Sequence, residues 1–244
     1  MSAPRGFFIH GYHDWNTPAS GWVGEVPAFR ALRRLGHLDL ACPITLIAGE
    51  NGVGKSTLLE GIAVSCGFND GGGPFGAEAR SRNNPLRDIA GVTRGGRAME
   101  GYFLRAESHF NVATEFGEHG PGVSNLHRMS HGESVLQVVQ ESFHSGGLYL
   151  LDEPESGLSM IRQMTLLAEL HHLAQSGAQI IMATHSPVLL ALPGARIWEF
   201  SAEGGVRRDI GLRETTAFRA LQDFLADPEG IAEFMVEVTA GDAE

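Results

Sequence analysis

Apolar residues along the chain follow two patterns, and segments with the two patterns alternate. Short runs rich in β-branched residues predict strands, and apolar residues three and four positions apart predict helices. We expect strands at residues 7–10, 38–40, 44–48, 102–105, 148–153, 179–184 and 197–200. We expect helices at residues 57–63, 134–143, 159–175, 214–225 and 229–238. Strands that alternate with helices predict an α/β fold with a mostly parallel sheet flanked by helices on both faces.

Glycine-rich segments mark where these patterns are interrupted. Residues 6–47 contain only short strands broken by turns, and we expect these N-terminal strands to be antiparallel. Residues 67–76 have no regular pattern and are expected to end the preceding helix. The glycines of residues 117–122 interrupt a helix that is expected to begin just before them. Gly204 and Gly205 predict a hairpin near the C-terminus.

Composition indicates a single globular domain over residues 1–244. The chain is 43% hydrophobic, which is enough for a packed core. No apolar run approaches the roughly 20 residues of a membrane span, and the N-terminus has no secretion signal. Cys42 and Cys66 are too few for a disulfide framework and lack a metal-ligand neighbour. We therefore expect a cytoplasmic protein without membrane insertion.

Lys55 is the only lysine of the chain, since the other 17 of its 18 Lys and Arg residues are arginine. It stands in G-E-N-G-V-G-K-S-T at residues 49–57, which has the spacing of a Walker A loop. A strand is expected directly before this loop and a helix directly after it, as the motif requires. An arginine-biased genome would explain the missing lysines but not the position of the remaining one. We therefore expect the loop to bind a nucleotide.

Each residue type in this loop has a chemical role. Glycines allow positive φ angles, so that successive N–H groups turn toward an anion. The N-terminus of the following helix adds about half a positive charge. Lys55 supplies a point charge to the β and γ phosphates, and Ser56 supplies a hydroxyl ligand to Mg²⁺. The residues expected to bind the nucleotide are Gly49, Glu50, Asn51, Gly52, Val53, Gly54, Lys55, Ser56 and Thr57.

Two carboxylates end the apolar run L-Y-L-L-D-E at residues 148–153. A buried strand of this kind delivers Asp152 to the carboxyl edge of the sheet, where α/β proteins bind ligands. Asp152 is therefore a candidate Mg²⁺ ligand, as the Walker B aspartate is. Glu153 is the candidate that polarises the water attacking the γ phosphate. A glutamate directly after that aspartate is typical of an ATPase rather than of a GTPase or a small-molecule kinase.

His185 follows the next expected strand, in the sequence A-T-H-S-P. Adjacent parallel strands would bring its imidazole close to Glu153 and the γ phosphate, where it would sense whether that phosphate is present. We expect the other ten histidines to be structural or exposed. The predicted catalytic residues are therefore Lys55, Glu153 and His185.

The order of these motifs resembles that of the ABC-type ATPases. In that family a signature motif lies between Walker A and Walker B, and R-M-S-H-G-E-S at residues 128–134 is similar to its L-S-G-G-Q sequence. The resemblance implies that Ser130, Gly132 and Glu133 contact the nucleotide held by an opposite subunit. It also implies a D-loop at residues 156–159. The cofactors would be ATP and Mg²⁺, and the chain would form an ATP-dependent homodimer.

Details of the motifs resemble small stand-alone soluble bacterial ATPases of the SMC, RecF and OLD-like group. Their D-E-P-E-x-x-L form is similar to D-E-P-E-S-G-L at residues 152–158, and Glu133 is typical of their signature. The resemblance implies a P-loop NTPase core of the ABC ATPase type, with a short helical subdomain at residues 107–145 carrying the signature. The segment between Lys55 and Ser130 leaves no room for long coiled-coil arms.

Two family features have no clear match in the chain. The family places a glutamine after the strand at residues 102–105, where this chain has Glu107 or Ser108. Glu107 would reach Mg²⁺ or water and is a candidate metal ligand. Phe29 and Tyr12 are the candidates for stacking on adenine, with core packing as the alternative for Phe29.

An arginine-rich segment contrasts with the net charge of −11. Residues 80–105 contain six arginines against Asp88 and Glu100, together with several glycines. A mobile loop of this composition would contact a nucleotide, a nucleic-acid backbone or an acidic partner. The alternative is a solvated loop in an arginine-rich protein.

The residues together predict a soluble ATP hydrolase whose ATP-bound dimer is a conformational switch. Its output would go to a protein or nucleic-acid partner, in DNA maintenance or phage defence. The first alternative is the nucleotide-binding subunit of an ABC transporter, which requires a membrane partner. The second is an ATP-gated scaffold that hydrolyses little, against which Glu153 argues.

Overall fold

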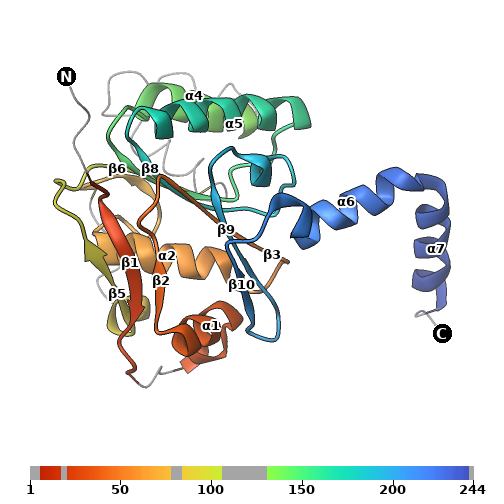
Figure 1. Cartoon of the computed structure of the whole chain (residues 1–244), viewed down its shortest axis with the longest axis horizontal. Coiled ribbons are helices and arrows are strands. Elements are labelled where there is room, and N and C mark those ends of the chain that lie inside the picture. The colour runs from red at the N-terminus through yellow and green to blue at the C-terminus, as the bar shows by residue number, and fades with distance from the viewer. Residues whose placement is uncertain (1–5, 18–20, 78–83, 106–130, 242–244) are drawn as a thin grey trace.

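A seven-stranded sheet forms the centre of the fold, with the strand order β10-β9-β3-β8-β7-β6-β4 (Figure 1). The computed structural model describes residues 6–17, 21–77, 84–105 and 131–241. The five central strands are parallel: β9 (Arg196–Phe200), β3 (Ile44–Gly49), β8 (Gln179–Ala183), β7 (Leu148–Asp152) and β6 (Gly101–Arg105). Antiparallel strands form the edges: β10 (Val206–Arg208) and β4 (Gly73–Pro74). The predicted α/β fold with a mostly parallel sheet is confirmed.

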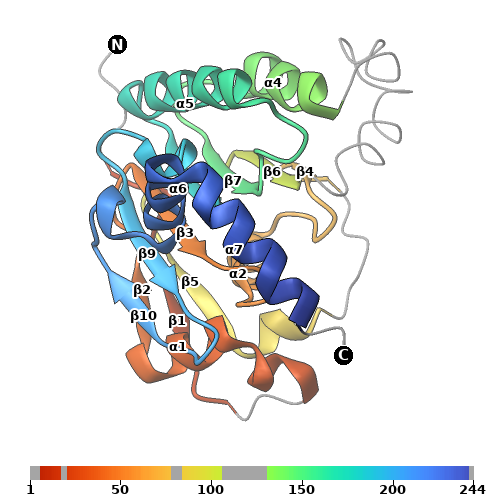
Figure 2. The same cartoon turned by 90° about the vertical axis from the view of Figure 1, so that its right-hand side faces the viewer.

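Helices cover both faces of this sheet. On one face lie α4 (His131–Ser142) and α5 (Met160–Gln175), which run side by side in Figure 2. On the other face lies α2 (Lys55–Cys66). Successive residues of the central strands point to opposite faces, so Leu150 of β7 packs with α2 and Tyr149 packs with α4 and α5. Burial on both faces explains why these strands are continuous apolar runs.

A second, three-stranded sheet lies on the α2 side of the molecule (Figure 1). It is antiparallel and has the order β2-β1-β5, from β1 (Ile9–Asp14), β2 (His37–Asp39) and β5 (Ala90–Arg94). Together with α1 (Pro27–Leu35) it shares a hydrophobic core with α2. The expectation of antiparallel strands at the N-terminus is confirmed.

Three segments differ from the expectations drawn from the sequence. Residues 27–35 form α1 rather than strands, because Pro27 begins the helix and Ala28, Phe29, Ala31 and Leu32 are buried at helical spacing. The stretch 90–94 forms β5 rather than loop, since its backbone pairs with β1. Gly73–Pro74 forms the edge strand β4, a position where proline is tolerated.

One buried side chain connects the two sheets. Gln179, at the start of β8, is 1% exposed. Its Oε1 accepts hydrogen bonds from the backbone N–H groups of Phe8 and Ile9, at 2.9 and 3.1 Å. Its Nε2 donates to the carbonyl oxygens of Ile9 and Leu40, at 2.9 and 2.7 Å. The amide therefore satisfies four backbone groups that the packing of the two sheets removes from water.

The C-terminal part extends away from the sheets. The hairpin of β9 and β10 is confirmed, and two helices follow it, α6 (Thr216–Ala226) and α7 (Pro228–Gly241). Figure 1 shows both helices beyond the central sheet, and α6 has no buried residue. Among the described helices, none combines the length and the apolar character needed to cross a bilayer.

Replacing Gln179 by methionine tests the connection between the sheets. Methionine has a similar shape but leaves the four backbone groups without partners, so we expect the free energy of unfolding to fall by about 3 kcal/mol. Urea denaturation followed by circular dichroism measures this change. Gln140→Met is the matched control, because Gln140 is exposed on α4 and bonds to the side chain of Glu169 rather than to buried backbone groups. Equal stabilities of the two variants would contradict the role of Gln179.

Candidate functional site

The loop between β3 and α2 has the backbone conformation that an anion-binding loop requires. Gly49, Gly52 and Gly54 have φ angles of 143, 80 and 92°. A Cβ at Gly54 would lie 2.2 Å from a methyl carbon of Val26, so both the space and the φ angle call for glycine. The helix α2 begins at Lys55, which directs the helix N-terminus into the loop.

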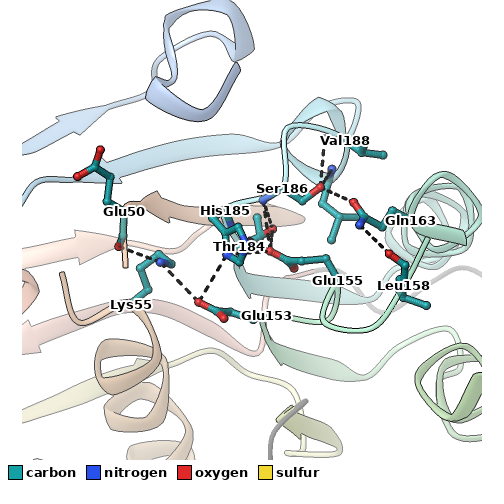
Figure 3. A network of polar contacts seen from close by, with 11 residues as sticks. Glu50, Lys55, Glu153, Glu155, Leu158, Gln163, Thr184, His185, Ser186 and Val188 are labelled. Atoms are coloured by element: carbon teal, nitrogen blue, oxygen red, sulfur yellow. Dashed lines mark hydrogen bonds and ion pairs between the residues drawn. The ribbon is translucent and has the colours of Figure 1, made fainter. Parts of the chain in front are cut away.

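Lys55 is held inside this loop. It is 4% exposed, and its Nζ donates a hydrogen bond to the carbonyl oxygen of Glu50 at 3.0 Å. The same Nζ lies 3.6 Å from Oε1 of Glu153, across the carboxyl edge of the sheet (Figure 3). The ammonium is therefore paired with a carboxylate at the position where a phosphate would bind.

Glu153 is placed by an unusual backbone conformation. It follows β7 directly and has a φ angle of 47°, in the left-handed region that non-glycine residues seldom adopt. Its N–H donates to the carbonyl oxygen of Ala183 at 2.9 Å, which fixes the residue against the end of β8. Such a conformation costs about 1–3 kcal/mol, and strained residues of this kind cluster at functional sites.

His185 completes a cluster around that carboxylate. Its Nδ1 lies 3.7 Å from Oε1 of Glu153 and 3.4 Å from Oε1 of Glu155. Lys55 and His185 thus approach the same oxygen of Glu153 from different elements (Figure 3). The structure brings together the three residues that the sequence predicted as catalytic.

Glu155 anchors the loop that carries His185, and the sequence analysis did not single it out. This carboxylate is 6% exposed. Its Oε1 accepts hydrogen bonds from the Thr184 hydroxyl at 2.6 Å and from the N–H groups of His185 and Ser186 at 2.9 and 3.2 Å. The D-E-P-E sequence contains this carboxylate, but only the fold reveals that the loop after β8 wraps around it (Figure 3).

A second set of hydrogen bonds ties the same loop to α5. The hydroxyl of Ser186 donates to Oε1 of Gln163 at 2.6 Å, and Nε2 of Gln163 donates to the carbonyl oxygen of Leu158 at 3.0 Å. Residues 156–159, the expected D-loop, therefore connect through Gln163 to the loop of His185. A movement of either loop would therefore strain the hydrogen bonds that connect it to the other loop.

Asp152 lies at the end of β7, next to Glu153 and 7% exposed. Its Oδ2 lies 3.8 Å from Nε of Arg105, and Arg105 also bonds to Glu60 at 2.9 Å. No group of three or more His, Cys, Asp or Glu residues in the described ranges is arranged as a complete metal site. A single carboxylate is compatible with Mg²⁺, which takes several of its ligands from water and substrate phosphates.

A cleft of about 610 Å³ opens beside the loop. Its lining includes Asn51, Lys55, Ser56 and Glu153, together with Trp22, which is 56% exposed. The two sequence candidates for adenine stacking do not line this cleft, and the alternative of core packing for Phe29 is confirmed. Tyr12 is fully buried and Phe29 is 7% exposed, and both belong to the core beneath α2. Trp22 is the exposed aromatic residue of the cleft.

Some of the predicted site residues cannot be placed. Ser130 and Glu107, and most of the expected helical subdomain at residues 107–145, lie outside the described residues. Gly132 and Glu133 fall in the first turn of α4, where only the backbone is described. Their roles stay predictions.

The described arginines of the arginine-rich segment have different roles. Arg97, expected in a mobile loop, is structural: its Nη1 and Nη2 donate to the carbonyl oxygens of Gly177 and Gly146, both at 2.7 Å. Its Cζ also lies 3.9 Å from the centre of the Phe8 ring. Arg105 belongs to the carboxylates around Asp152. Arg87 and Arg94 line an open pocket on the three-stranded sheet.

Comparisons with known proteins identify families and relatives that this chain is similar to. Residues 129–191 match the model of an AAA domain described for the AbiEii toxin, Type IV TA system, and residues 27–110 match a second AAA domain model. The chain is 28% identical over 183 residues to the vitamin B12 import ATP-binding protein BtuD of Salmonella typhimurium, covering 62% of this chain and 71% of that protein.

Two further similarities were found. The ABC transporter G family member STR2 of Medicago truncatula is 24% identical over 187 residues, which is 62% of this chain but 24% of that protein's length. A solved structure of an inward-facing ABC transporter of the metal-chelate type aligns with a TM-score of 0.46 and 20% identity, over 73% of this chain and 77% of that one.

Substituting Glu155 tests how the loop of His185 is held. Glu155→Ala leaves the amides of His185 and Ser186 without their acceptor, so we expect these amides to exchange hydrogen at least about tenfold faster. Glu155→Gln keeps one acceptor oxygen and should retain most of the protection. Hydrogen exchange followed by mass spectrometry or NMR measures both. Unchanged exchange in Glu155→Ala would contradict the anchoring role.

Proposed function

The chain is an ABC-type P-loop ATPase, and we propose that it hydrolyses ATP with Mg²⁺ and uses ATP binding to close a homodimer. The observation that carries this proposal is the approach of Lys55 and His185 to one oxygen of Glu153, at 3.6 and 3.7 Å, beside the glycine loop. A cation, a candidate base and a candidate sensor of the γ phosphate then share one site.

The described residues suggest how ATP would be held. Backbone N–H groups of the loop and the N-terminus of α2 would bind the β and γ phosphates, together with Lys55. Ser56 and Asp152 would hold Mg²⁺, which supplies neutralisation of the phosphate charge. Trp22 would stack on the adenine, since it is the exposed aromatic side chain lining the cleft.

The pairing of Lys55 with Glu153 would make ATP binding precede the step in which Glu153 accepts a proton. An incoming γ phosphate would compete with the carboxylate for Lys55 and displace it. The freed Glu153 would then accept the proton of the attacking water. His185 would move its contact from Glu153 to the phosphate, and Glu155 would keep the backbone of that loop in place.

The homodimer follows from the signature motif. Ser130, Gly132 and Glu133 of one subunit would contact ATP bound to the other, so that closure requires the γ phosphate. Hydrolysis would remove that contact and reopen the dimer. The output would go to a protein or nucleic-acid partner, in DNA maintenance or phage defence.

A second candidate function is the nucleotide-binding subunit of a transporter. The names of BtuD and STR2 favour it. A subunit of this kind needs a membrane protein as its partner. Affinity purification of the tagged chain from detergent-solubilised membranes distinguishes the two functions, because a stable multi-span membrane partner is expected only for the transporter subunit.

Glu153→Gln tests the hydrolysis step. We expect phosphate release to fall at least about 100-fold while ATP binding becomes tighter, because a competing charge for Lys55 is removed. A phosphate-release assay and equilibrium binding of ATP measure the two effects. Glu229→Gln is the control, since Glu229 is exposed on α7. Equal rates for wild type and Glu153→Gln would contradict the proposed role.

The dimer is tested in the same background. Glu153→Gln with ATP and Mg²⁺ should have the mass of a dimer by light scattering, and adding Ser130→Arg should keep it monomeric through steric and charge conflict. ADP in place of ATP should also give monomer. A monomer in Glu153→Gln with ATP would reject the sandwich dimer.

Trp22→Ala tests the base-binding side of the cleft. Stacking of a base on an aromatic side chain contributes about 1–3 kcal/mol to binding, so the loss of the indole should raise the Kd for ATP roughly tenfold. The Kd for inorganic triphosphate, which has no base, should stay unchanged. Isothermal titration calorimetry measures both constants. An equal effect on ATP and triphosphate would assign Trp22 a structural role instead.

A further inference from the structure

A second open pocket lies on the three-stranded sheet, away from the cleft of the P-loop. Its volume is about 470 Å³, and its lining includes Trp15, Arg87, Arg94, His13 and Thr93. It shares no lining residue with the cleft beside Lys55. Val64 and Ser65, near the C-terminal end of α2, form its floor, whereas Lys55 begins the same helix. The helical rise of about 1.5 Å per residue separates the two sites by roughly 15 Å.

Trp15 presents a flat apolar surface to this pocket. Trp15 is the first residue after β1, and it is 55% exposed. Its indole lies against the backbone of Gly91 in β5, where a Cβ would come within 2.5 Å of a ring carbon. The glycine therefore lets the ring lie on the strand. An exposed indole supported in this way is a ready stacking surface for a planar ligand.

Positive charge surrounds that surface. Arg87 and Arg94 line the pocket, and none of its lining residues in the described part of the chain is a carboxylate, although the chain has 29 acidic residues and a net charge of −11. Nε of Arg87 is buried and has no hydrogen-bond partner among the described residues. Arg94 donates from Nη2 to the carbonyl oxygen of Cys66 at 3.0 Å, which fixes the guanidinium, a group with five N–H donors.

Two further polar side chains extend the same surface. Oγ1 of Thr93 and Nε2 of His13 are hydrogen-bonded at 2.6 Å, and the His13 ring stacks on His37 with centroids 5.6 Å apart. These groups can donate to or accept from sugar and base atoms. The pocket thus combines a stacking platform, two guanidinium groups and polar side chains.

We propose that this pocket binds single-stranded nucleic acid, with one base on Trp15 and the neighbouring phosphates on Arg87 and Arg94. A base in a duplex keeps both faces stacked, so only an unpaired base can lie on the indole. Guanidinium groups bind phosphate oxygens in a planar, bidentate manner. This inference goes beyond the ATPase proposal and names its nucleic-acid partner, but binding to the pocket does not depend on ATP.

Fluorescence anisotropy of labelled 12-nucleotide strands, dT and rU, with the full-length protein in the absence of ATP tests the proposal. We expect binding that weakens about tenfold in Trp15→Ala. Arg87→Ala with Arg94→Ala should weaken binding and lower the slope of log K against log salt by about 1.4, because each phosphate that is no longer neutralised lowers it by about 0.7. The comparison of dT with rU identifies DNA or RNA as the preferred source.

Matched controls separate this site from the ATP cleft. Trp22→Ala should bind the strands like wild type and lose ATP affinity, whereas Trp15→Ala should keep the ATP affinity and the circular dichroism spectrum of wild type. Arg30→Ala with Arg219→Ala removes the same charge from exposed positions elsewhere and should leave strand binding unchanged.

Three results would overturn the proposal: no binding of either strand, equal binding by Trp15→Ala and wild type, or equal binding of a duplex and a single strand. Because ATP is absent, these results leave the proposed hydrolysis untouched. A protein without ATPase activity that still binds strands through Trp15 would refute the proposed function and keep this inference.

Discussion

The parallel register of β3, β8 and β7 is the constraint on which the candidate site depends. In this register Ile47 of β3 lies opposite Ala183 of β8, and Ala183 lies opposite Asp152 of β7. The strands β8 and β7 therefore end at the same level of the sheet, and β3 continues two residues further, to Gly49. The segments that leave these strands meet at one edge, and they carry a glycine loop, a glutamate and a histidine. A shift of one residue in either pairing would turn these side chains to the wrong face.

The charges at this edge are arranged in two layers. Glu153 is the outer carboxylate, with its side chain 31% exposed, and it contacts Lys55 and His185. Glu155 is the inner carboxylate, and it is buried against the backbone of the loop after β8. Oε1 of the inner carboxylate holds the loop after β8, whereas the outer carboxylate contacts two side chains and can exchange these partners. This division explains how two glutamates two positions apart can have different roles.

Much of this site could be predicted from the sequence because strand order and motif order constrain each other. Lys55, Glu153 and His185 each follow an apolar run, and runs of that kind become neighbouring parallel strands. Glu155 was not predicted, because its importance lies in amide groups 30 residues away that turn toward it. Tyr12 was chosen as a candidate for adenine stacking because it is aromatic. The choice was wrong because Tyr12 is buried in the packed core, and residue type alone does not predict burial.

The glycine and arginine content of the arginine-rich segment likewise gave no indication that part of it has ordered structure. The pairing of β5 with β1 and the bonds of Arg97 to two carbonyl oxygens are long-range contacts that local composition does not reveal.

We propose above all that Lys55 and Glu153 act on one ATP molecule at the edge of the sheet. Single-turnover phosphate release, with protein in excess over ATP and Mg²⁺, tests it most directly. Wild type should convert the bound ATP to ADP and phosphate in one exponential phase, and Lys55→Ala should not. Phosphate release at the same rate in Lys55→Ala would contradict the claim.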